Sequence, residues 1–176
     1  MVPLQDVTMA VVGGAFGQPP EIWANKRISE VCSDIIESHA GNGVVLTQAD
    51  IIPRKGIRVV RIPGEEPGKA PPTLRIARFV AQFVKNHPKI KTVWVVAAWY
   101  HMPRMLRDVK WAFAELGITD VLILPAKGRV GIWPRRKWFC KDSTQSRTTG
   151  DLQWWIREIP LLMMTVFPPL YKKVAS

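Results

Sequence analysis

The fold is decided by residues 92–117, TVWVVAAWYHMPRMLRDVKWAFAELG. The run Val93–Ala98 is apolar and rich in β-branched residues, which is typical of a strand buried on both faces of a sheet. A helix is predicted over Pro103–Leu116, because apolar residues recur there at three- and four-residue spacing. Proline suits the first helical position, and Gly117 suits the residue just past the last turn. The segment therefore predicts a buried strand followed directly by a helix.

The turn between this strand and helix, Trp99–Arg104, carries one imidazole and one guanidinium. In parallel α/β sheets, ligands bind where the strands end and the helices begin. Arg104 offers a fork of donors suited to phosphate or carboxylate, and backbone N–H groups at a helix start also favour anions. His101 can donate a hydrogen bond or act as a general acid/base near neutral pH. We therefore predict His101 as the catalytic candidate and Arg104 as an anion-binding residue; the alternative is a loop histidine and a solvated arginine.

The flanking sequence repeats the alternation of strand and helix. Strands are predicted at residues 7–12, 44–47, 57–62 and 121–124, and helical patterns at 28–36 and 73–85. The pattern predicts one domain over residues 1–176, a Rossmann-like three-layer α/β sandwich with a mostly parallel sheet of about five strands. The link between the second and third strands is about nine residues, too short for a helical crossover. Either a compact turn replaces that helix or the two strands are antiparallel.

Four further residues are candidates for ligand binding at the ends of these strands. Gly13 and Gly14 follow the first strand, where missing side chains would let the backbone approach a ligand closely. Arg27, near the start of the next helix, points into the same crevice as Arg104 if that helix packs under the strand end. A solvated helix arginine is the alternative. Asp50 follows the second strand and is expected to face the crevice.

The composition favours an anionic partner. Lys and Arg number 25 against 14 Asp and Glu, which gives a formal net charge of +11 and a pI near 10.1. Nucleic acid, acidic lipid and phosphorylated ligands all fit this charge. Only Cys32 and Cys140 are present, so we expect neither a disulfide framework nor a metal site. With no signal-peptide pattern and no apolar run near the ~20 residues that span a bilayer, we expect a soluble cytoplasmic protein.

The last third of the chain divides into a basic loop, residues 127–147, and a helical tail, residues 148–173. The loop has seven basic residues and interleaved aromatic ones: Lys127, Arg129, Arg135, Arg136, Lys137, Lys141, Arg147, Trp133, Trp138 and Phe139. Such a loop is typical of nucleic-acid binding, although tryptophans can equally pin a loop to the fold. The tail carries apolar residues at helical spacing, Leu152, Trp155, Ile156 and Ile159, and is expected to dock on the sheet. A membrane surface or a second subunit is the alternative partner for the tail.

Several of these residues resemble motifs of the YdcF-like family, also called domain of unknown function 218 and SanA/ElyC-like. His101 and Arg104 match the family's His-x-x-Arg feature, and Gly13 and Gly14 match its first glycine turn. Thr73 matches the threonine of its Asn-Thr-x-Glu-Asn-like stretch, whose amide and acidic members are absent here. The chain resembles a diverged member without the membrane anchor. The resemblance implies a Rossmann-like fold with a polar crevice and a nucleotide-like ligand such as S-adenosylmethionine.

Together these patterns predict a protein that binds a phosphate-bearing or other anionic, nucleotide-like small molecule. Arg104 and Arg27 would hold the anion, His101 would donate or act as acid/base, and Thr73 would orient the ligand or the histidine. A hydrolase or transferase activity extends this prediction, since the sequence has no clear pair of nucleophile and base. The alternative is a basic module that attaches to nucleic acid or an anionic membrane through the 127–147 loop.

Overall fold

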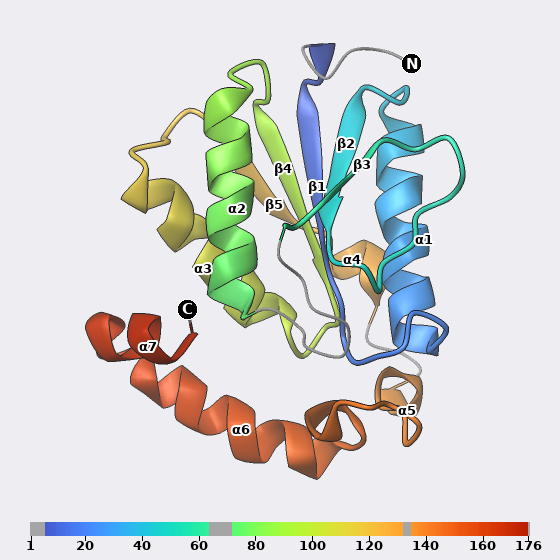
Figure 1. Ribbon diagram of the computed structural model, residues 1–176, viewed down its shortest axis with the longest axis vertical. Helices are drawn as coiled ribbons and strands as arrows, with labels where there is room; N and C mark the ends of the chain where they lie inside the picture. Colours follow the sequence, from blue (N-terminus) through green and yellow to red (C-terminus); the bar gives the residue numbers. More distant parts are fainter. Residues whose placement is uncertain (1–5, 64–71, 132–134, 176) are drawn as a thin grey trace.

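The computed structural model describes residues 6–63, 72–131 and 135–175. Its centre is a five-stranded, all-parallel sheet in the order β3-β2-β1-β4-β5 (Figure 1). The strands are β1 (Met9–Gly14), β2 (Gly43–Thr47), β3 (Val59–Arg61), β4 (Thr92–Ala97) and β5 (Leu122–Pro125). The sheet and its covering helices confirm the predicted three-layer α/β fold. Residues 63–72, PGEEPGKAPP, have the proline and glycine content that predicts a loop with solvated Glu65 and Glu66, and they lie almost wholly outside the described residues.

The central strand is β1, which pairs with β4 along its whole length. All six residues of β1 are buried, which explains its continuous apolar run. The strand extends two residues beyond its predicted end, so Gly13 and Gly14 lie in the sheet and not in a turn. A Cβ at Gly13 would lie 2.8 Å from Thr47 Oγ1, and one at Gly14 would collide with the Met105 sulfur. These two glycines therefore allow close packing inside the core.

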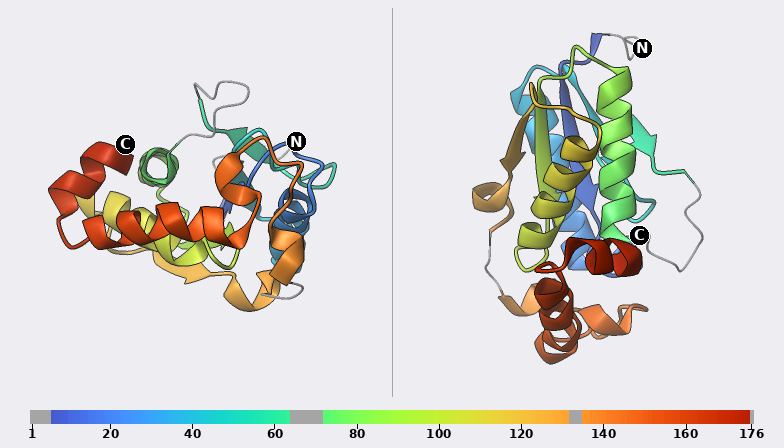
Figure 2. Two further views of the ribbon diagram at one scale, coloured as in Figure 1. Left: turned by 90° about the horizontal axis from the view of Figure 1, so that it is seen from below. Right: turned by 90° about the vertical axis from the view of Figure 1, so that its left-hand side faces the viewer.

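The helices cover both faces of the sheet. On one face lies α1 (Trp23–Ser38), and on the other lie α2 (Thr73–Asn86) and α3 (Met102–Glu115) (Figures 1 and 2). Right-handed crossovers require this, because the chain moves outward from β1 to β2 and then returns across the sheet to β4. The strand order consequently reverses between β1 and β4, which is the position where α/β sheets bind ligands.

The short link between β2 and β3 contains no helix, and the two strands are nevertheless parallel. The compact turn is therefore the correct alternative. Arg61 supports this turn, since its guanidinium donates to the backbone carbonyls of Gln48 and Ile51. Hydrogen bonds from the Arg61 side chain to the backbone thus stabilise this turn, which takes the place of a crossover helix.

The basic segment is more ordered than the loop that the sequence predicts. It contains α4 (Lys127–Val130), α5 (Arg135–Trp138) and the 3₁₀ helix η2 (Ser146–Thr148). Trp138 is fully buried and packs edge-to-face on Phe16 and Trp23, with ring centroids 6.5 and 4.9 Å away. Phe139 also contacts Phe16, so both aromatic residues pin the segment to the fold. Trp133 lies outside the described residues.

The tail forms two helices, α6 (Asp151–Met164) and α7 (Pro168–Ala175), and α6 crosses the edge where the strands end (Figure 1). The prediction that the side of α6 with Leu152 and Ile156 docks on the fold is wrong. Leu152 and Ile156 are exposed, whereas Trp154, Glu158 and Leu161 are buried. Trp154 packs on Phe16 at a centroid distance of 4.8 Å, which holds α6 against the chain that leaves β1.

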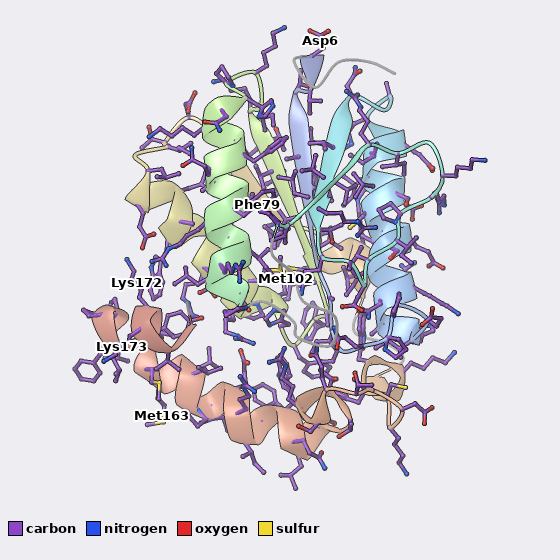
Figure 3. All side chains as sticks on the ribbon, in the orientation of Figure 1. Asp6, Phe79, Met102, Met163, Lys172 and Lys173 are labelled. Atoms are coloured by element: carbon purple, nitrogen blue, oxygen red, sulfur yellow. The ribbon has the colours of Figure 1, made fainter. Side chains whose placement is uncertain are left out.

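The final helix docks on α3 through polar contacts. The Tyr171 hydroxyl lies 2.8 and 3.0 Å from the two carboxylate oxygens of Asp108, which is fully buried. Burial raises the pKa of Asp108, while the Tyr171 hydrogen bond and the Arg107 charge lower it in part. Lys172 Nζ lies 2.5 Å from Glu115 Oε1 of α3, and Figure 3 shows this lysine beside that helix. None of the described helices is long and apolar enough to cross a membrane.

Gly17 connects β1 to α1 in a backbone conformation that side chains rarely adopt, with φ of +95°. A Cβ there would lie 2.7 Å from both Ser143 Oγ and Thr148 Oγ1. Gly56 has the same φ of +95°, but no described atom lies within 4 Å of a Cβ at that position. An alanine at Gly56 would therefore cause backbone strain alone, whereas an alanine at Gly17 would cause both strain and a steric collision.

We expect Gly56→Ala to lower the free energy of unfolding by about 1 kcal/mol through backbone strain alone. Gly17→Ala should lower it by about 1–3 kcal/mol more, because the added methyl group must displace two buried hydroxyls. Urea unfolding of both variants measures the difference. Equal decreases in the free energy of unfolding would show that the residues around Gly17 accommodate the methyl group without a loss of stability.

Candidate functional site

A cavity of about 380 Å³ lies where the strand order reverses, between the ends of β1 and β4 and helix α6. Its walls are formed by residues 15–17 after β1, the starts of α2 and α3, the segment around η2, one face of α6, and Val174 of α7. The polar lining residues are Gln48, Thr73, His101, Arg104, Gln145, Arg147, Thr148 and Arg157. Its volume lies in the range of small-molecule sites.

Three residues predicted from the sequence meet in this cavity as one hydrogen-bonded chain. Arg104 Nη2 lies 3.2 Å from His101 Nδ1, and His101 Nε2 lies 3.4 Å from Thr73 Oγ1. A guanidinium can only donate, so Nδ1 of the neutral imidazole is the acceptor and the ring proton sits on Nε2. Arg104 Nε also donates to Glu158 Oε1 at 3.0 Å, and this hydrogen bond connects the three residues to α6.

His101 is a neutral group in this environment. Burial lowers its pKa well below the ordinary 6.5, and the charges of Arg104, Arg147 and Arg107 lower it further. Both ring nitrogens are engaged, one as acceptor from Arg104 and one as donor to Thr73. The imidazole in this arrangement orients its neighbours, and it has no free nitrogen with which to remove a proton from a ligand.

The cavity carries an excess of positive charge. Arg104, Arg147 and Arg157 line it, and no Asp or Glu is found among its described lining residues. Burial, followed by the charges of Arg157 and Arg104, lowers the pKa of Arg147 to about 10 from its ordinary 12.5. Among the described residues Glu158 forms its salt bridge with Arg104, and its charge also partly offsets the lowering of the Arg147 pKa. Burial raises the pKa of Glu158 itself against the effect of Arg104. The described lining of the cavity is therefore net positive.

Two polar groups at the cavity lack partners within the described part of the chain. The guanidinium of Arg147 is half-buried and makes no hydrogen bond or salt bridge to a described residue. The indole Nε1 of Trp154 is buried without an acceptor among those residues. Because buried polar groups and charges are normally paired, both are positions where a bound molecule would supply the missing partner.

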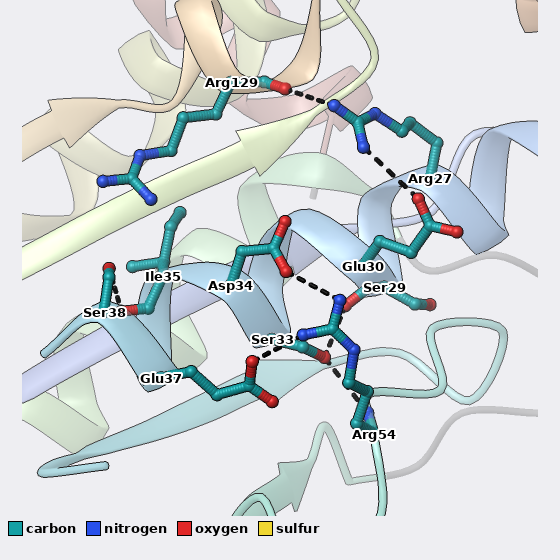
Figure 4. Close-up of polar contacts among 10 residues, drawn as sticks. All are labelled: Arg27, Ser29, Glu30, Ser33, Asp34, Ile35, Glu37, Ser38, Arg54 and Arg129. Carbon is teal, nitrogen blue, oxygen red and sulfur yellow. Dashed lines mark hydrogen bonds and ion pairs between the residues drawn. The ribbon is translucent and has the colours of Figure 1, made fainter. Parts of the chain in front are cut away.

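The other predicted site residues lie outside the cavity lining. Arg27 donates to the Arg129 backbone carbonyl at 2.7 Å and pairs with Glu30 at 3.3 Å, so it joins α1 to α4 (Figure 4). Asp50 accepts a hydrogen bond from Gln18 Nε2 at 3.1 Å, and burial raises its pKa. Gly13 and Gly14 sit in the sheet, where their backbones pair with β2 and β4.

Sequence reasoning missed Arg147, Trp154 and Arg157, which the chain brings in from the basic segment and the tail. A signal for Trp154 existed, because Trp154, Glu158 and Leu161 share one helical face. No local pattern distinguishes Arg147 from its exposed basic neighbours.

The sequence matches no protein-family model and shows no significant similarity to a curated protein. The resemblance to the YdcF-like family therefore stays a prediction.

The buried imidazole gives a pH prediction. In the unfolded chain His101 binds a proton below about pH 6.5, whereas the folded chain binds it only at lower pH. The unfolded state then holds more protons, so stability is present above this pH and is lost on acidification. When the pH is lowered from 7.5 to 5.5, the free energy of unfolding of the wild type should fall by about 1 kcal/mol more than that of His101→Gln.

Urea unfolding of both proteins at the two pH values measures this difference. His39, His87 and the buried carboxylates are common to both proteins, so their effects largely cancel. Parallel pH profiles would show that His101 is protonated equally in the folded and unfolded states.

Proposed function

We propose that this protein binds a small molecule bearing a phosphate or another anionic group in the cavity between the ends of β1 and β4. The observation that supports it is the convergence of Arg104, Arg147 and Arg157 on a cavity whose described lining has no carboxylate. Guanidinium forks match the oxygens of phosphate and carboxylate, and charge-assisted hydrogen bonds are among the strongest that proteins make. Arg147 carries the proposal furthest, because its guanidinium makes no salt bridge to a carboxylate of the described residues, and the charge of Glu158 only partly offsets the repulsion from Arg157 and Arg104.

The rest of the lining indicates what else the ligand carries. Phe16, Ile76, Trp154 and Leu161 form an apolar and aromatic wall beside the arginines. A molecule with an anionic end and a planar or apolar part, as in a nucleotide, suits this combination. S-adenosylmethionine fits poorly, since its sulfonium and ammonium groups would meet three guanidinium groups.

Binding is supported better than a particular reaction. The lining hydroxyls are those of Thr73, beside His101, and Thr148, which bonds to Ser143 Oγ at 2.8 Å and the Gln145 carbonyl at 2.9 Å. An anion that takes the Nη2 donor of Arg104 would release His101 Nδ1 beside the ligand. Hydrolase or transferase chemistry would begin from that rearrangement.

Attachment to nucleic acid through residues 127–147 receives less support. Trp138 and Phe139 pack into the fold, and Arg147 lines the cavity, so these side chains are engaged elsewhere. Stacking on bases needs exposed aromatic faces. The small-molecule proposal is therefore preferred.

Arg147→Gln tests the proposal against Arg27→Gln, which removes the same charge outside the cavity. Affinity for inorganic phosphate, pyrophosphate or AMP should fall about tenfold or more in Arg147→Gln, because one charge-assisted contact is lost. The unliganded variant should be as stable as the wild type or more so, since repulsion with Arg104 and Arg157 is relieved. Arg27→Gln should keep the wild-type affinity.

Titration calorimetry measures the affinities, and urea unfolding measures the stabilities. The proposal would be rejected if none of the three anions bound the wild type, or if Arg147→Gln bound them as tightly. A variant that lost both affinity and stability would assign Arg147 a structural role instead.

A further inference from the structure

The outer face of α6 is an exposed apolar surface that continues into α7. Its members recur at alternating four- and three-residue spacing along α6 and past its end. They are Leu152, Ile156, Ile159, Met163 and Val166, followed by Phe167 and Leu170. We call this set the α6–α7 apolar face. Single exposed apolar residues are ordinary, whereas a contiguous set of this size marks an interaction site.

The helix does not need this face in order to pack on the fold. Its inner face already contributes Trp154, Glu158 and Leu161, all buried, and Glu158 pairs with Arg104. Figure 3 shows Met163 pointing away from the sheet, on the outer side of α6. The apolar face is therefore available to a partner while the cavity stays intact.

The part of the chain that carries the α6–α7 apolar face is rich in positive charge. Residues 127–176 contain ten Lys and Arg against three Asp and Glu. Lys137, Lys141 and Lys173 are exposed, and Glu158 is buried against Arg104. A partner with an apolar interior and an anionic surface complements both features.

We propose that the α6–α7 apolar face binds the surface of a membrane that contains anionic lipid. Amphipathic helices of this kind lie in the interface plane, with the apolar face among the acyl chains and basic residues at the phosphates. A second copy of the chain suits the face less well. It would bring two strongly cationic segments together, with few exposed carboxylates to pair with them.

This inference is independent of the anion-binding cavity, because the α6–α7 apolar face is formed by the opposite side of α6. Substitutions on the outer side therefore leave Arg104, Arg147 and Arg157 in place. Calorimetry with the same anions would show whether both sites are intact in one variant.

The test is flotation with vesicles of phosphatidylcholine alone and of phosphatidylcholine mixed with phosphatidylglycerol. The variant is Ile156→Ser with Met163→Ser, and the matched control is Ile52→Ser with Leu122→Ser. The exposed fractions are 66% and 69% in the variant pair and 59% and 57% in the control pair. All four side chains are largely in solvent, so both double variants should keep the wild-type circular dichroism and unfolding midpoint.

We expect the wild type to bind the mixed vesicles more tightly than the zwitterionic ones. The Ile156/Met163 variant should bind about tenfold or more weakly, because two apolar side chains no longer leave water. The control pair should bind as the wild type does. Absence of vesicle binding, or equal binding by the Ile156/Met163 variant, would overturn the proposal. A dimer in sedimentation velocity that this variant abolishes, without vesicle binding, would assign the face to a second copy.

Discussion

The contact between Arg104 and Glu158 joins the sheet layer to the helix that closes the cavity. Arg104 is fixed by the start of α3, which follows β4 directly, and Glu158 is the buried carboxylate of α6. Removing one partner of a buried pair typically costs about 3–5 kcal/mol, since the other charge stays behind unpaired. The position of α6 over the strand ends therefore depends on a side chain that also bonds to His101. One guanidinium thus sets both the shape of the cavity and the tautomer of its histidine.

The Arg104–Glu158 pair is neutral as a whole, so the positive charge of the cavity comes from its other arginines. Glu158 compensates Arg104, while Arg147 and Arg157 remain without a carboxylate at bonding distance among the described residues. Like charges in a partly desolvated site oppose folding, and the lowered pKa of Arg147 reflects that repulsion together with burial. Sites that bind ligands commonly keep such locally unfavourable arrangements, because the ligand relieves them. An anion bound as proposed would therefore stabilise the cavity.

The sequence predicted the architecture because local signals agreed with the global fold. The apolar run of β4, Pro103 in the first turn of α3 and Gly117 after its end are all read from neighbouring residues. His101 and Arg104 share a site because the end of a strand fixes both, and Thr73 reaches them because α2 and α3 pack side by side. These relations follow from topology, which the alternation of strands and helices determines.

The sequence-based predictions failed where contacts with residues distant in the sequence, and not the local pattern, determine the structure. Hydrophobicity favours the stripe with Leu152 and Ile156 as the docking face of α6, yet the face with Glu158 is buried. Arg104, which lies 54 residues away, pairs with that carboxylate and offsets part of the cost of burying it. Gly13 and Gly14 were similarly read as a turn, because their close contacts come from β2 and α3. Spacing along the chain carries no information on either partner.

The two faces of α6 explain how one short helix can carry two proposed roles. Its inner face is polar at Glu158 and aromatic at Trp154, so it is held by specific contacts with Arg104 and Phe16. Its outer face is apolar without a partner among the described residues, so its burial would add stability only through association. The two proposed roles therefore use different residues of the same helix, those facing the fold and those facing solvent.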